Sequence, residues 1–156
     1  MNILAQILVS LVLLSFAGIR QQAPAVNQGI LGTVSIREGN FMPGPDRKGK
    51  KLPAAATKEK VSPREIYVYE LTNLKQVSAN GPFYNNIKSK LVAKVSTGTD
   101  GLFRVSLEPG KYSVFSKEPG GLFANQLDGE GNIYPVVVTQ NRLTLIDFII
   151  DYNASY

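Results

Sequence analysis

The fold of this chain is decided by residues 100–114, which read DGLFRVSLEPGKYSV. Between Leu102 and Leu107, apolar and polar side chains alternate, which is the period-two pattern of a strand with one buried face. The Asp100-Gly101 pair before this run and the Pro109-Gly110 pair after it supply residue types that tight turns require. The stretch therefore predicts a β-strand bounded by turns, with a second strand beginning near Tyr112.

Short runs of the same kind fill the chain from Gly29 onward, separated by Gly, Pro, Asn and Asp. No run is long enough to show the 3.6-residue period of an amphipathic helix. Pro135 has no backbone N–H, so we expect its strand to lie at a sheet edge or to begin only after it. The sequence predicts an all-β, seven-strand antiparallel β-sandwich. The expected strands cover residues 30–36, 65–71, 90–96, 102–107, 112–117, 133–138 and 142–152.

Length and composition limit the classes of function. A chain of 156 residues fits one domain with a single hydrophobic core. The chain contains no cysteine and no histidine. This excludes disulfides, thiolate metal sites, most zinc hydrolases and every mechanism of the Ser-His-Asp or Cys-His type. The composition therefore favours a protein that is not an enzyme.

The amino-terminal segment, residues 1–17, is an apolar run with no charged side chain before Arg20. Its length and small carboxy-terminal residues are typical of a secretory signal peptide, with a cleavage site after residue 17 or as late as residue 25. We expect a mature domain over residues 29–152 in a secreted or periplasmic protein. The alternative is an uncleaved membrane anchor, because the run is close to the length of a span. This segment would then be the only contact with a membrane.

Most of the excess positive charge lies in residues 39–63, which are rich in proline and lysine. The formal net charge is +5, of which about four comes from the stretch between Arg37 and Glu65. Few of these side chains can be buried, so we expect a long basic loop between the first two strands. Lys48, Lys50 and Lys51 could bind an acidic polymer or lipid headgroups, or the loop could simply be solvated. Nucleic acid is not expected, because no aromatic residues lie between these lysines to stack on bases.

The run at residues 100–114, with the opening Gly32-Thr33-Val34, resembles the signature of the carboxypeptidase regulatory-like domain. That family belongs to the transthyretin-like and collagen-adhesin-B-type sandwich group. The resemblance covers residues 29–152 apart from the basic insertion. It implies a Greek-key sandwich that serves as a spacer, folding aid or adhesive module, since domains of this kind identify a fold better than an activity. The run itself predicts one hairpin turned by Pro109-Gly110, with a core of Phe103, Val105, Leu107, Tyr112 and Val114.

Asp128, Glu130 and Asn132 are candidate calcium ligands. They occupy alternate positions with glycines between them, which lets three oxygen atoms converge in a tight loop. A helix–loop–helix calcium site would need a further Glu and flanking helices, whereas strand-like sequence follows here. The alternative is a turn built from residues that accept a positive φ. No cofactor other than calcium is suggested by the residues.

Four aromatic residues are candidates for an exposed binding patch: Tyr67, Tyr69, Phe83 and Tyr84. In the strand expected at residues 65–71, tyrosines alternate with apolar residues, so one face should be core and the other aromatic. An exposed aromatic face would stack on sugars or peptides. The alternative is that the tyrosines pack between the two sheets and have only a structural role.

These features predict an exported, non-catalytic structural or interaction module at the cell envelope, with an envelope protein or a glycan as partner. One alternative is an accessory protein that binds carbohydrate or peptide, and another is an uncharacterised hydrolase. An exposed, contiguous aromatic patch would favour ligand binding, whereas a concave pocket with converging carboxylates would favour an enzyme.

Overall fold

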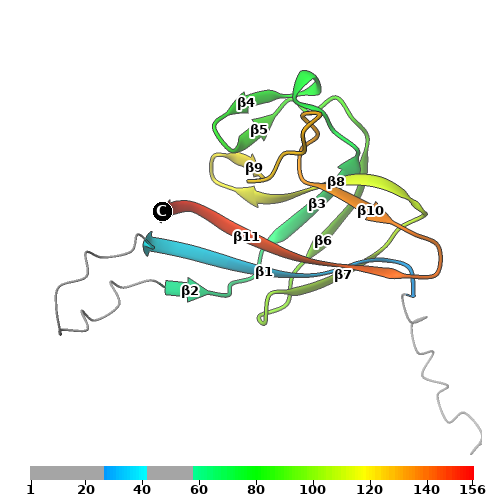
Figure 1. Cartoon of the computed structure of the whole chain (residues 1–156). Helices are drawn as coiled ribbons and strands as arrows, with labels where there is room; N and C mark the ends of the chain where they lie inside the picture. Colours follow the sequence, from blue (N-terminus) through cyan, green and yellow to red (C-terminus); the bar gives the residue numbers. More distant parts are fainter. Residues whose placement is uncertain (1–26, 42–57) are drawn as a thin grey trace, which may run out of the picture.

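A computed structural model describes residues 27–41 and 58–156, which form two β-sheets packed face to face (Figure 1). The strands of the four-stranded sheet, called sheet A, are β1 (Gly29–Asn40), β2 (Lys58–Lys60), β7 (Leu102–Ser106) and β11 (Leu143–Ser155). Those of the seven-stranded sheet, called sheet B, are β3 (Glu65–Glu70), β4 (Ser78–Asn80), β5 (Phe83–Asn85), β6 (Leu91–Ser96), β8 (Gly110–Glu118), β9 (Gly121–Phe123) and β10 (Pro135–Val138). One short 3-10 helix, η1 (Leu74–Gln76), lies between β3 and β4. The predicted all-β sandwich is confirmed.

The order of strands in sheet A is β11-β1-β2, and β7 pairs with the start of β1. In sheet B the order is β4-β5-β9-β8-β3-β6, and β10 pairs with β8. Figure 1 shows the two longest strands, β1 and β11, running side by side. They are parallel. The sandwich is therefore not antiparallel throughout, which differs from the antiparallel sandwich that the sequence predicts.

Seven strands coincide with the runs that the sequence identified, and four short ones, β2, β4, β5 and β9, do not. The strand β2 lies inside the expected basic loop and pairs with Ile36–Glu38 of β1. The prediction for Pro135 is confirmed, because it begins β10 and that strand pairs only with β8 among the described residues.

The prediction of a hairpin around Pro109-Gly110 is wrong. The strand β7 pairs with β1 in sheet A, whereas β8 pairs with β3 in sheet B, so the chain crosses between the sheets at this turn. The side chains expected in the hairpin core are nevertheless all buried. Both strands turn their apolar face to the space between the sheets, so the alternation is satisfied without the pairing.

The core between the sheets is aliphatic and aromatic. Phe123 of β9 and Phe148 of β11 meet edge to face across it, with ring centroids 6.3 Å apart. Both side chains are fully buried, and burial of this much apolar surface is the main force that holds the two sheets together.

Gly32 lies in the middle of β1, directly opposite Phe103 of β7. A Cβ atom at this position would overlap the ring of Phe103 and lie 2.9 Å from Ile146 Cγ1. The aromatic ring therefore covers the glycine backbone. This packing fills the space that the missing side chain leaves in the strand.

Candidate functional site

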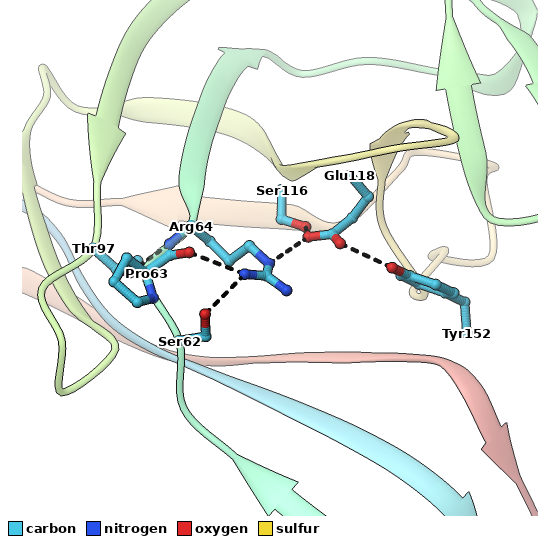
Figure 2. A network of polar contacts seen from close by, with 7 residues as sticks. All are labelled: Ser62, Pro63, Arg64, Thr97, Ser116, Glu118 and Tyr152. Atoms are coloured by element: carbon cyan, nitrogen blue, oxygen red, sulfur yellow. Dashed lines mark hydrogen bonds and ion pairs between the residues drawn. The ribbon is translucent and has the colours of Figure 1, made fainter.

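A buried carboxylate joins the two sheets near the end of β8. The side chain of Glu118 is only 1% exposed. Its Oε1 accepts hydrogen bonds from Arg64 Nε at 2.9 Å and from Ser116 Oγ at 3.0 Å, and its Oε2 accepts one from the Tyr152 hydroxyl at 3.0 Å. Figure 2 shows Arg64 and Tyr152 approaching the carboxylate from opposite sides. Arg64, Glu118 and Tyr152 are called the inter-sheet clamp below.

The guanidinium of Arg64 is itself held in place. Its Nη1 donates to Ser62 Oγ at 3.1 Å and to the Pro63 carbonyl at 3.0 Å, while the Arg64 backbone N–H donates to Thr97 Oγ1 at 2.9 Å (Figure 2). A charge removed from water is tolerated only when its partners are in good geometry. The hydrogen bonds around Arg64 supply that geometry.

Tyr152 reaches the clamp from the other sheet. Its ring packs against Phe83 and Phe123, with centroids 5.0 and 5.4 Å away. Burial, and then the hydrogen bond to Glu118, raise the pKa of Tyr152. Nothing local in the sequence pointed to this clamp, because a glutamate beside Pro119-Gly120 is typical of an exposed turn.

A surface depression of about 500 Å³ lies beside the clamp and is lined in part by Glu65 and Glu118. Two carboxylates in one hollow are the feature that would favour a hydrolase. Here, however, Glu118 is bound by three side chains and Glu65 pairs with Lys94 at 2.7 Å. The two carboxylates are therefore already engaged by other side chains of the fold.

The tyrosines of β3 lie on the outer face of sheet B. Ile66 and Val68 point into the core, and Tyr67 and Tyr69 alternate with them on the opposite face, half-buried. The prediction that this strand has one apolar and one aromatic face is confirmed. Tyr69 stands edge to face against Phe115, with centroids 5.7 Å apart, and its burial raises its pKa.

Lys94 of β6 covers Tyr67. The two residues are cross-strand partners, and Lys94 Nζ lies 5.0 Å from the centre of the Tyr67 ring. Lys94 also pairs with Glu65, and this hydrogen bond lowers the pKa of Glu65 and raises that of Lys94. Glu65, Lys94 and Tyr67 therefore lie next to one another on the surface, with the ammonium of Lys94 in contact with both the carboxylate and the ring.

The other two aromatic candidates, Phe83 and Tyr84, lie on β5. Phe83 packs on Phe123 and Tyr152, with the Phe123 centroid 5.8 Å away, and Tyr84 is buried against Phe115, also at 5.8 Å. The structure therefore brings Tyr69 and Tyr84 together on the ring of Phe115, whereas Phe83 packs against Phe123 and Tyr152.

The strand β6 is the last strand of sheet B and has a free edge within the described residues. It carries two apolar side chains that face solvent, Leu91 at 44% exposure and Val92 at 40%. The register shifts between Val68 and Tyr69 of the neighbouring β3, which marks a bulge at this end of the pair. An unpaired edge of this kind is a template for another strand.

The edge of β11 that faces away from β1 is protected instead. The Asp147 carbonyl accepts a hydrogen bond from the Tyr134 hydroxyl at 3.0 Å, and the Ile149 carbonyl accepts one from Asn125 Nδ2 at 3.1 Å. Side chains thus occupy two of the acceptors that a further strand would use.

The candidate calcium ligands form a hydrogen-bonded turn. Asp128 Oδ1 accepts from the backbone N–H groups of Glu130 and Asn132 at 2.9 and 2.8 Å, and its Oδ2 accepts from Asn132 Nδ2 at 2.8 Å. These bonds lower the pKa of Asp128. The remaining oxygen of Asn132 accepts from Asn73 Nδ2 at 3.1 Å. These contacts agree with the turn alternative, and calcium binding stays a prediction.

Several other predictions fall on residues that the structure does not describe. Lys48, Lys50 and Lys51, and the expected signal peptide over residues 1–17, lie outside residues 27–41 and 58–156. Within those two ranges, no helical segment has the length and hydrophobicity of a membrane span. Nor do the described residues bring three or more acidic side chains together as a metal site. Comparison with protein-family models, curated proteins and solved structures finds no match to this chain.

Proposed function

We propose that the protein is an exported, non-catalytic interaction module of the cell envelope, and that it binds an extended segment of a partner polypeptide along β6. The observation that carries this proposal is the free edge of β6, which lies beside the outward-facing Tyr67 and has two exposed apolar residues, Leu91 and Val92. Addition of a strand to an exposed sheet edge is a general mode of peptide recognition.

The backbone of β6 supports this mode. The N–H of Thr97 donates to the Arg64 carbonyl at 2.8 Å, on the side of β3. Backbone groups of successive residues in an antiparallel strand point to alternate sides. The groups of Val95 and Ala93 therefore face β3, and those of Lys94 and Ser96 face the free edge. Two donors and two acceptors on one edge can hold an added strand in register.

The neighbouring side chains define the chemistry of the partner. Side chains of an added strand that point outward would lie beside Lys94, where a carboxylate is favoured. Those that point inward would lie beside Ala93 and Val95, which are half-buried and take apolar neighbours. The preferred segment is thus extended, with apolar and acidic residues in alternation.

A glycan is the weaker candidate for this face. Sugars stack on open aromatic rings, whereas the Tyr67 ring has the Lys94 ammonium 5.0 Å from its centre and Tyr69 is packed against Phe115. A sugar would have to displace Lys94 from both its ring and its ion pair with Glu65.

Export and the lack of catalysis rest on the sequence. The apolar run over residues 1–17 supports export, and a chain without histidine and cysteine lacks the commonest catalytic groups. A β-sandwich also suits the adhesive role that the resemblance to carboxypeptidase regulatory-like domains implies.

A random library of short displayed peptides, panned on the full chain, tests the proposal. We expect enrichment of sequences in which acidic and apolar residues alternate. The variant Lys94→Pro should abolish their binding, because it removes an edge-facing N–H that the sheet itself does not use. The matched variant Lys94→Ala keeps that N–H but loses the charge, so it should bind more weakly than the unchanged chain and still bind detectably. Peptides that bind Lys94→Pro as well as the unchanged chain, or a library with no enrichment, would contradict the proposal.

A further inference from the structure

The outer face of sheet A presents an apolar and charged pattern of its own. Three strands lie side by side in the order β7, β1, β11, and their register aligns two rows of outward side chains. The first row is Arg104, Leu31 and Leu145, and the second is Leu102, Thr33 and Asp147. Arg104 and Asp147 therefore occupy opposite corners of the pattern, and Leu102 and Leu145 occupy the other two.

The leucines of this face are unusually open to solvent. Leu145 is 73% exposed and Leu102 is 46% exposed. With Leu31 they line a depression of about 270 Å³. A sheet face on which large apolar side chains are grouped and left uncovered is typical of a contact surface.

The two charges at the corners are both on the surface. Arg104 and Asp147 are exposed, and the Asp147 carboxylate is oriented by a hydrogen bond from the Thr33 hydroxyl. Leu102 and Leu145 thus lie at the two ends of one diagonal of the pattern. The positive Arg104 and the negative Asp147 lie at the two ends of the other.

We infer that a second copy of this chain docks on the outer face of sheet A. A two-fold axis along the diagonal from Leu102 to Leu145 places each of these leucines against its own equivalent. The same rotation brings Arg104 close to the partner's Asp147, and Asp147 close to the partner's Arg104. The pattern is therefore complementary to itself, which is the requirement for a symmetric dimer contact.

The spacing of strands and residues fits this rotation. Two strand spacings are about 10 Å and two residue steps are about 7 Å, so the pattern is a rectangle, and the rotation brings Arg104 to within about 4 Å of a position directly over the partner's Asp147. Rotation about its diagonal crosses the strands of the two copies at near right angles, which is one of the two arrangements that packed sheets adopt. Because crossed sheets overlap over only about three strand widths, the dimer belongs to the class of small, weak interfaces.

Cysteine trapping in the full chain tests this contact, and the natural chain has no cysteine to interfere. Leu145→Cys and Leu102→Cys should each give a disulfide-linked dimer under mild oxidation, because the axis sets each residue against itself. Arg104→Cys and Asp147→Cys should link only when the two variants are mixed. The exposed control Lys75→Cys, on η1, should give little dimer.

A charge exchange separates this geometry from chance collisions. In the Leu145→Cys background, Arg104→Glu should lower the yield of dimer several-fold, and adding Asp147→Arg should restore it, since the opposite charges then meet again. Unfolding by urea checks that each variant is folded. Dimer yields at Leu145 and Leu102 no higher than at Lys75, or a yield that the charge exchange does not change, would overturn the inference.

Discussion

The hydroxyl of Tyr152 donates a 3.0 Å hydrogen bond to Glu118 Oε2, and this contact joins β11 of sheet A to the end of β8 in sheet B. Replacement of Tyr152 by Phe keeps the ring packing but leaves one oxygen of a buried carboxylate without this donor. We expect Tyr152→Phe to lower the free energy of unfolding by about 1–2 kcal/mol. Urea denaturation measures the loss. Tyr156→Phe is the control, because the Tyr156 hydroxyl bonds to Asp151 at an exposed site, and equal effects of the two variants would argue against a clamp.

The Arg64–Glu118 pair gives a larger effect. Arg64→Met removes the charged partner of a carboxylate whose side chain is 1% exposed, while the Arg64 side chain is itself 26% exposed. Leaving a buried carboxylate without this partner costs about 2–3 kcal/mol. Lys60→Met breaks the exposed pair of Lys60 with Glu38 and should cost under about 1 kcal/mol. The double variant Arg64→Met with Glu118→Leu should recover part of the stability. A loss for Arg64→Met no larger than that for Lys60→Met would show that Glu118 is not buried in solution.

The packing of Phe103 over Gly32 predicts a cost for the smallest substitution. Gly32→Ala places a methyl group into the Phe103 ring, and overpacking of a core costs about 1–3 kcal/mol. Gly129→Ala is the matched control, because no atom lies within 4 Å of a Cβ at that position. Thermal unfolding of the two variants compares them directly, and a neutral Gly32→Ala would mean that Phe103 does not cover β1 as described.

Tyr134 predicts how stability changes at alkaline pH. Burial raises its pKa to about 12 in the folded protein, from an ordinary value of 10.0. The folded state holds this proton more tightly, so the contribution of Tyr134 to stability is complete below pH 10 and falls as the pH rises toward 12. Burial also raises the pKa values of Tyr69, Tyr84, Tyr112 and Tyr152. Ultraviolet titration should therefore show several tyrosines that ionise above their ordinary pKa of 10.0, and Tyr134→Phe should remove the last of these steps. A step near pH 12 that persists in Tyr134→Phe would assign the highest pKa to another tyrosine.

The parts of the fold that depend on local pattern could be predicted from the sequence. Phe103 and Val105 alternate with polar residues, and the period of two fixes which side faces the core whatever strand lies next to it. Their partner strand could not be predicted, because pairing of β7 with β1 rather than β8 depends on the whole topology. The strand β2 was missed because Lys-Glu-Lys has no apolar alternation.

The same distinction applies to the candidate sites. The outward position of Tyr67 and Tyr69 follows from their alternation with Ile66 and Val68, and the structure agrees. The Arg64–Glu118 contact joins residues 54 positions apart, and no local pattern marks Glu118 as buried. Its only trace in the sequence is that each residue flanks a strand.

The most direct test of the proposed function is amide hydrogen exchange of β6 in the full chain, with and without a peptide enriched from the displayed library. We expect the amides of Lys94 and Ser96 to exchange readily in the free protein and to become protected when the peptide binds, because their N–H groups face the free edge. Those of Ala93 and Val95, which face β3, should be protected in both states. Unchanged exchange at Lys94 and Ser96 in the presence of bound peptide would contradict the proposal that β6 is the binding edge.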